Sequence, residues 1–599
     1  MCGIAGYIGK EFKSNSIIQD TLKTLHHRGP DSRGYYNTTD LNSNNLYLLH
    51  TRLNIIDLEK RSNQPFQLGS YTLIFNGEIY NYLEVKTLLL KEGIKFETTG
   101  DTEVLARALI HWGIDAALDK LEGMWSFAFY NKKTGNLYLC RDRFGEKPLY
   151  FKTLTDGIYF SSETLSLSKL LNKSLDFNFD QIHRYLINGY KSIYKHNSSF
   201  YEKVNQIEQG HYIKINKDLK LTVKRYWKPK LQIDEKLSYK DSVHKVREEL
   251  IRSISIRLRS DVPIAFCMSG GVDSNALISI AKKQKEFDVH GFTIVNTDQR
   301  YNENELVQKA VQDLQISHTS VPLQKKNFLD DLKKLIKAHD SPVYTIAYFL
   351  HWKLMKAISK EGFKVSISGT GADELFTGYY DHGNLFLNST HKNESDFNLA
   401  LEGWKKNHLP YVRNEHLRDP YLYINNPKFR DHVYDDSSFF SNFLNNEWHE
   451  NFYEKNYGLS LLRNRMLNEL FYEVVPVILH EDDLNAMYFS IENRSPFLDR
   501  KLFETAFSIP ENYLIKDGIK KSVLRDAVKS FVSEPIVNNP KKIGFNGPIE
   551  DLLDIEDSNV KELLLDDSGV FEIINKSKIE KLLKKINFQT VKANLFLIL

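Results

Sequence analysis

The sequence predicts a protein of two domains, in the α/β and α+β classes: a layered β domain followed by a doubly wound α/β domain. Its 599 residues are too many for one hydrophobic core. Roughly the first 210 residues contain short apolar strands bounded by turn signals. After about Trp227, short strands alternate with long helices, and from about Phe376 the pattern is mostly helical.

The first half contains the segments from which a layered sheet would be built. Strands are predicted over 71–75, 125–130 and 136–140, next to Asn-Gly, Thr-Gly or Asp-Gly pairs. Helical periodicity occurs over 82–92 and 102–112. We expect β layers with helices on their outer faces.

The change of pattern places the boundary in a lysine-rich stretch around Pro229. We expect a first domain over 1–215, a linker over 216–235 and a second domain over 236–599. In the second domain a helix is predicted over 239–258. Uninterrupted apolar strands are predicted over 262–268, 290–295 and 364–368, as is typical of a buried parallel sheet.

Composition narrows the function classes. The formal net charge is +3, from 80 basic and 77 acidic residues, which does not indicate a nucleic-acid partner. Three cysteines are too few for a disulfide framework and are typical of a reducing compartment. The sequence shows no secretory signal and no apolar run of the ~18 residues that a membrane helix needs. We therefore expect a cytoplasmic protein that does not bind membranes.

The chain opens with Met-Cys-Gly-Ile-Ala-Gly. If Met1 is removed, Cys2 carries a thiol and a free α-amine, and an amine with a pKa near ~8 can accept the thiol proton. The alternative is that Cys2 is a small residue at the start of a buried strand. Position alone leaves both interpretations open.

Two loops follow predicted strands of the second half. Ser269-Gly-Gly-Val-Asp-Ser274 precedes a predicted helix, so glycine amides and a helix start can bind phosphate. The loop lacks the lysine of the Walker type and resembles the PP-loop of ATP pyrophosphatases. The second loop is Ser368-Gly-Thr-Gly-Ala-Asp373. Asp273 and Asp373 are candidate Mg²⁺ ligands.

Further motifs extend this pattern over nearly the whole chain. Polar clusters lie at 27–31, 50–53, 76–81 and 100–103, and further matches at 141–150, 160–163, 490–499 and 542–545. Each cluster alone is compatible with turn chemistry. Together the motifs resemble the glutamine-hydrolysing asparagine synthetase family. The resemblance implies an N-terminal-nucleophile αββα sandwich, then a parallel-sheet ATP pyrophosphatase domain with a helical C-terminal part.

The resemblance assigns roles in the first domain. Cys2 would attack the side-chain amide of glutamine, giving a thioester and ammonia. Asn76 and the Gly77 N–H would hold the oxyanion. Arg52 would bind the α-carboxylate of glutamine, and Glu78 and Asp101 its α-ammonium.

It also assigns roles in the second domain, where a carboxylate acceptor would be activated as its adenylate and then aminated. Lys521 would neutralise phosphate charge. The implied cofactors are ATP and Mg²⁺. The oligomeric state stays open, and a homodimer is one possibility. The residues implied for ATP are Met268, Ser269, Gly270, Gly271, Asp273, Ser274, Ile294, Ser368, Gly369 and Lys521.

Two other function classes are weighed. A tRNA-modifying PP-loop enzyme predicts a basic face and further cysteines, and the sequence has neither. A non-catalytic, glutamine-sensing relative predicts damage at Cys2, Asn76, Asp101 or the first loop, and all are intact.

The motifs do not identify the carboxylate acceptor. Thr370 and Asp373 are the candidate residues of the site that binds it. Asparagine-forming members usually have Ser-Gly-Glu-Gly in the second loop, where this chain has Thr370. They also commonly have Asp-Arg-x-Ser-Met, where this chain has Leu484 and Ala486 in place of arginine and serine. Aspartate is the family default. The two changes favour a larger acceptor, such as the uronic acid of a sugar nucleotide used for surface polysaccharide.

Overall fold

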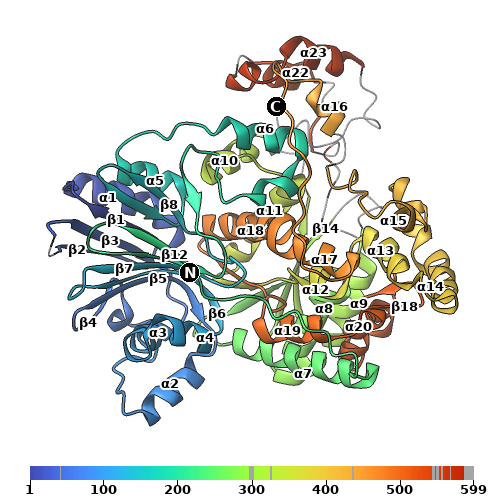
Figure 1. Cartoon of the computed structure of the whole chain (residues 1–599), viewed down its shortest axis with the longest axis horizontal. Helices are drawn as coiled ribbons and strands as arrows, with labels where there is room; N and C mark the ends of the chain where they lie inside the picture. The colour runs from blue at the N-terminus through green and yellow to red at the C-terminus, as the bar shows by residue number, and fades with distance from the viewer. Residues whose placement is uncertain are drawn as a thin grey trace.

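Two six-stranded antiparallel sheets pack face to face in the first half of the chain (Figure 1). Fully buried side chains of both sheets, such as Leu48 and Leu139, form the core between them. The first sheet has the order β10 (Asn205–Gln206), β8 (Tyr150–Leu154), β9 (Gly157–Ser161), β1 (Cys2–Gly9), β3 (Asn45–Arg52), β2 (Ser32–Thr39). The second has the order β12 (Leu221–Arg225), β11 (His211–Ile215), β7 (Asn136–Arg141), β6 (Gly123–Asn131), β5 (Tyr71–Ile79), β4 (Phe66–Leu68).

Helices cover the outer face of each sheet. On the first sheet lie α1 (Asn15–Thr24) and α5 (Thr164–Leu171), which bury Leu22 and Leu167. On the second lie α2 (Tyr82–Lys91), α3 (Asp101–His111) and α4 (Gly113–Lys120). The helix–sheet–sheet–helix order confirms the αββα fold, and α2 and α3 confirm the helices predicted over 82–92 and 102–112.

The last strand of the second sheet lies within the stretch predicted as a linker. Residues 221–225 form β12 and pair antiparallel with β11. The chain then extends to α7 (Tyr239–Arg257), the first long helix of the second half. β11 needs a partner on its outer side, and β12 provides one in spite of its lysine-rich sequence.

The second half is built on a five-stranded parallel sheet. Its order is β15 (Ser317–Pro322), β14 (His290–Val295), β13 (Ile264–Cys267), β16 (Val365–Ile367), β17 (Glu492–Arg494). α8 (Val272–Lys285) packs on one face, and α11 (Ile346–Lys360) and α18 (Val475–Tyr488) pack on the other. This confirms the doubly wound prediction. The strand order reverses between β13 and β16, which is where such sheets bind ligands.

The rest of the second half is mostly helical, as predicted. One π-helical segment, Glu469–Glu473, joins α17 to α18. The other helices are α6 (Phe179–Asn188), which reaches over from the first half, α9 (Asn304–Leu314), α10 (Phe328–His339), α12 (Ala372–Phe376), α13 (Tyr380–Thr390), α14 (Glu394–Asn407), α15 (Leu422–Asn425), α16 (Ser437–Ser441), α17 (Leu461–Asn468), α19 (Arg500–Ser508), α20 (Ser522–Val528), α21 (Glu534–Val537), α22 (Ser558–Leu564) and α23 (Lys576–Lys585).

The computed structural model does not describe every residue. It describes 1–40, 42–295, 302–323, 327–434, 437–541, 545, 547, 549, 552–554, 557–566 and 568–585. Residues 542–544 of the motif at 542–545 therefore lie outside the described residues. Within the described part, no helix is both long and apolar enough to span a bilayer.

The two halves meet along a polar interface that includes the start of the chain (Figure 1). The Met1 ammonium lies 3.0 Å from Glu492 Oε2 on β17. Arg28 donates to Asp483 of α18 at 2.8 Å, and the hydroxyl of Tyr150 lies 3.0 Å from His480 Nε2. Buried charges of one half are thus satisfied by the other, so the two halves are expected to hold a fixed orientation.

Candidate active sites

Cys2 is the first residue of β1 and is buried at the interface between the halves. Arg28 Nε donates to the Cys2 carbonyl oxygen at 3.1 Å. Burial raises the pKa of the Cys2 thiol, and the N-terminal ammonium opposes that rise. With Met1 in place the thiol therefore stays protonated at neutral pH, so the chemistry predicted for Cys2 needs the amine that removal of Met1 would free.

Asn76 lies on β5, opposite Cys2. Its Oδ1 accepts from the Cys2 N–H at 3.0 Å, and its Nδ2 donates to Ser126 Oγ at 3.3 Å. The Cys2 amide can only donate, so it fixes this orientation. The predicted oxyanion role requires the Asn76 amide to turn once Cys2 carries a free amine. At Gly77 a Cβ would lie 2.1 Å from the Met124 carbonyl oxygen, so no larger residue fits.

Arg52 ends β3 and is held by the loop that follows it. Its NH1 donates to Glu59 O and Asn63 Oδ1, and its NH2 donates to the carbonyls of Ile56 and Asp57. These contacts fix the guanidinium but use both terminal nitrogens. A glutamine carboxylate would therefore have to replace one of the carbonyls, or bind through Nε.

Glu78 and Asp101 form a pair of buried acids, the acidic pair, and the charge of Glu78 acts on the Cys2 thiol. Burial raises the pKa of Asp101 to about 6, although the Ile79 N–H donates to it at 2.9 Å. Burial also raises the pKa of Glu78, and the negative charges of Glu492 and Asp101 add to that rise. Glu78 Oε2 is buried without a hydrogen-bond partner. An amine cation beside the acidic pair would restore the favourable interactions that the carboxylates lack.

The first loop of the second half leaves β13 and enters α8. The Ser274 hydroxyl accepts from the Ser269 N–H at 3.1 Å, and Asn275 Nδ2 donates to the carbonyls of Ser269 and Gly271 at 2.8 Å. These bonds hold the loop with its two glycines at the helix start. Met268 and Ile294 lie at the ends of the neighbouring strands β13 and β14. The arrangement is that of an anion-binding loop.

Lys521 brings the two loops together. Its Nζ lies 2.6 Å from Asp273 Oδ2 and 2.5 Å from Asp373 Oδ1, and the side chain is buried. A Cβ on Gly369 would lie 3.3 Å from Asp273 Cβ, so the second loop passes directly over the first. Residues more than 240 positions apart thus form a single charged centre.

Thr370 lies on the same edge of the sheet. Its hydroxyl is 3.2 Å from that of Ser368, and Asn493 Nδ2 donates to Ser368 at 3.1 Å. Sequence reasoning missed Asn493 and also Glu492, which receives the Met1 ammonium. The motif at 490–499 contains both residues, but its sequence has no periodicity that indicates the strand β17 between the two sites.

A group of buried acids and a histidine lies behind the second loop. Asp381, His382 and Glu469 have side-chain atoms within 4.8 Å of one another. His382 uses both ring nitrogens: Nδ1 accepts from the Gly378 N–H, and Nε2 lies 2.7 Å from Glu469. Arg465 adds a buried cation to the group, at 3.2 Å from Glu469. The group is a charge network that supports the loop rather than a metal site.

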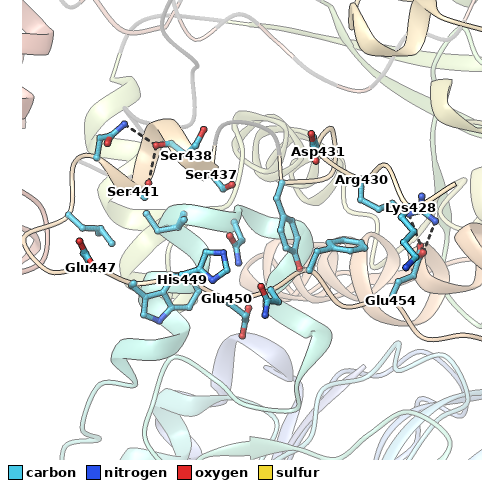
Figure 2. Close-up of a pocket in the computed structure, with 18 of the residues that line it drawn as sticks. Lys428, Arg430, Asp431, Ser437, Ser438, Ser441, Glu447, His449, Glu450 and Glu454 are labelled. Carbon is cyan, nitrogen blue, oxygen red and sulfur yellow. Dashed lines mark hydrogen bonds and ion pairs between the residues drawn. The ribbon is translucent and has the colours of Figure 1, made fainter. Parts of the chain in front are cut away.

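A large cavity lies apart from both sites, next to α16 and α17 (Figure 2). It measures about 1810 Å³ and is lined mainly by residues of 427–464. Some of its charged side chains are paired: Arg430 with Glu454 at 2.8 Å, and Glu450 with Arg184 of α6 at 2.6 Å. Nothing in it matches the chemistry of the two loops.

Two family profiles match successive parts of the chain. The family profile described as "Glutamine amidotransferase domain" matches residues 1–227, and that described as "Asparagine synthase" matches 245–594. "Asparagine synthetase (glutamine-hydrolyzing) 1" of Bacillus subtilis (strain 168) is 30% identical over 98% of this chain and 93% of its own length. "Asparagine synthetase (glutamine-hydrolyzing) 3" of the same organism is 26% identical over 90% and 86%. "Amidase chry2" of Gibberella zeae is 23% identical over 92% and 89%.

Proposed function

Because the chain belongs to the glutamine-hydrolysing asparagine synthetase family, and is thus a glutamine-dependent carbon–nitrogen ligase that uses ATP, we propose the reaction that its two sites carry out. Cys2, freed of Met1, attacks the glutamine amide and releases ammonia. The acceptor carboxylate is converted into its adenylate at the second site, and ammonia then displaces AMP to form the amide.

The observation that carries the proposal is the position of Lys521 between Asp273 and Asp373. A loop without a Walker lysine, facing a lysine held by two carboxylates, suits cleavage of ATP to AMP and pyrophosphate. Carboxylate oxygens are the donors that Mg²⁺ prefers, so Asp273 and Asp373 fit that ion. Bound there, it would neutralise pyrophosphate charge together with Lys521.

In the first site the acidic pair supports glutamine as the nitrogen donor. Glu78 and Asp101 would bind the α-ammonium, and Arg52 the α-carboxylate. Asn76 and Gly77 would stabilise the oxyanion, where preorganised donors contribute several kcal/mol.

We propose aspartate as the acceptor, in keeping with the names of the relatives. A uronic acid of a sugar nucleotide is the second candidate, because Thr370 and Leu484 replace a carboxylate and a cation expected for a zwitterionic acid with two carboxylates. At position 484 the side chain is a buried leucine, which cannot pair with a carboxylate.

One experiment tests both points. The protein is incubated with ATP, Mg²⁺, glutamine and one of four carboxylates: aspartate, glutamate, UDP-glucuronate or UDP-galacturonate. We expect acceptor-dependent release of AMP and pyrophosphate. A kcat/KM for aspartate above ~10⁴ M⁻¹s⁻¹ would identify the acceptor as aspartate. Stoichiometric ADP would refute the proposed cleavage of ATP.

A further inference from the structure

A carboxylate from α18 reaches the position where Thr370 departs from its family. Thr370 Oγ1 lies 3.3 Å from Asp482 Oδ2. Asn493 Nδ2 donates to the same oxygen at 3.3 Å, and His351 Nδ1 lies 3.5 Å from Asp482 Oδ1. The Asp482 carboxylate thus contacts the hydroxyl of Thr370, a residue of the loop that would hold the acyl adenylate.

Asp482 differs from the two acids beside it. Glu481 faces His339, at 3.4 Å, and Asp483 accepts from Arg28 of the first half at 2.8 Å. Successive residues of a helix point about 100° apart, so each of the three acids faces a different neighbour. Of these three, Asp482 is the one directed at the second loop.

The surroundings of Asp482 are suited to proton transfer. Among the described residues, the Asp482 carboxylate lies within ion-pairing distance of His351 and of no arginine or lysine. Burial raises the pKa of Asp482, and His351 and the Thr370 hydroxyl oppose that rise. A carboxylate that is held without a strong cation is a better base than one in a tight ion pair.

We infer that Asp482 supplies the carboxylate that asparagine-forming members carry in the second loop, and that it is the base for the amination step. The inference rests on the proposed function. Ammonia attacks the acyl carbon and a C–N bond forms. Asp482 takes one proton from the attacking nitrogen, the C–O bond to AMP breaks, and AMP leaves with that electron pair. The products are the amide, AMP and protonated Asp482, which releases its proton to solvent.

The test separates activation of the acceptor from its amination. Asp482→Asn is assayed with ammonium chloride as nitrogen donor and with the carboxylate selected by the panel above. Acceptor-dependent exchange of pyrophosphate into ATP should stay within about threefold of wild type, because it needs no base toward ammonia. Amide formation should fall by about 10²- to 10⁴-fold, the usual contribution of a general base.

A second variant moves the carboxylate back to the loop. In Thr370→Glu/Asp482→Asn, amide formation should recover at least tenfold over Asp482→Asn. The control Glu481→Gln alters the neighbouring buried acid and should leave the ratio of amidation to exchange unchanged. A merely structural role would lower exchange and amidation together and would not be rescued from position 370.

Each other result overturns a defined claim. Unchanged amidation in Asp482→Asn refutes the inference. Parallel loss of exchange and amidation, with glutamine hydrolysis intact, also refutes it and makes Asp482 part of acceptor binding. No acceptor-dependent exchange in the wild type, with any of the four carboxylates, refutes the proposed function itself and the inference with it.

Discussion

The carboxylates of the two candidate sites differ in whether they contact a cationic side chain. Next to Cys2, Glu78 and Asp101 have pKa values raised by burial, and Glu78 has an oxygen without a partner. At the second site, Asp273 and Asp373 both contact Lys521. Among the described residues, neither acid of the first site is in an ion pair, so the cation of a ligand can pair with them. The second site already contains a cation and is suited to a ligand rich in phosphate.

The largest effect should come from the nucleophile of the first site. Cys2→Ala should lower glutamine hydrolysis by at least about 10⁴-fold, because no other group can form the thioester. The rate of amide formation from ammonium chloride should stay within about twofold of wild type, since the second site is separate. Glutamate release and AMP production measure the two activities. Persistent glutamine hydrolysis in Cys2→Ala would exclude Cys2 as the nucleophile, and with it the role assigned here to the first site.

The next effect tests the second site. Lys521→Met should lower acceptor-dependent pyrophosphate exchange by about 10²- to 10³-fold, because two carboxylates would then repel the phosphates. Glutamine hydrolysis should not change. Lys520→Met is the matched control: the neighbouring Lys520 contacts the Tyr379 carbonyl and the Tyr380 ring. Equal losses in both variants would show that the effect is structural.

A smaller effect is expected when the acidic pair loses one charge. Asp101→Asn should raise the KM for glutamine about 10- to 100-fold, as for the loss of a charged hydrogen bond, with little change in kcat. In the wild type the KM should also rise as the pH falls below about 6, where Asp101 becomes protonated. A KM that does not depend on pH between 5 and 8 would exclude Asp101 from binding the ammonium.

Asp101→Asn should also affect the stability of the folded protein. The folded-state pKa of Asp101, about 6, lies above its ordinary value of 3.8. The folded protein therefore retains a proton that the unfolded chain has lost, and stability falls as the pH rises from about 4 to 6. At pH 7.5 the Asp101→Asn protein should melt at the same temperature as wild type or higher. A clear decrease in melting temperature would indicate that ionised Asp101 is already paired.

The smallest effect concerns a buried acid close to the interface. Burial raises the pKa of Glu146 to about 8, and Asp142 adds to the rise. Since the ordinary value is 4.5, stability should fall as the pH rises from about 5 to 8. Glu146→Gln should therefore raise the melting temperature more at pH 9 than at pH 6 and leave both activities unchanged. Equal shifts at the two pH values would refute this explanation.

Most of the fold could be predicted from sequence, because short apolar strands and turn residues are local signals. The strands β5, β6, β7, β13, β14 and β16 correspond to predicted segments, and β1 begins in a motif. No strand was predicted at β2, β4, β10, β11 or β15, and β12 lies in the stretch predicted as a linker. β17 could not be predicted, since its three residues, Glu492, Asn493 and Arg494, are polar and buried. Their partners, among them Met1, Ser366 and Arg257, are distant in the sequence.

The features of the two sites likewise include some that local sequence indicates and some that it does not. The two loops and Cys2 were evident as motifs, whereas the contact between Thr370 and Asp482 joins residues 112 positions apart and leaves no local pattern. The Met1 ammonium and Glu492 are 491 positions apart. Such pairs depend on how the two halves dock, which periodicity does not encode.

The neighbouring positions of Asp482 and Asp483 on α18 have a thermodynamic consequence. One contacts the acceptor loop, and the other is bound by Arg28, whose Nε also holds the Cys2 carbonyl. A shift of α18 that favours one ligand must therefore alter the free energy of binding the other. Linkage makes this reciprocal: if acceptor adenylate tightens glutamine binding by some factor, glutamine tightens binding of the adenylate by the same factor. Measuring both affinities, each with and without the other ligand, would give the coupling free energy carried by this one helix.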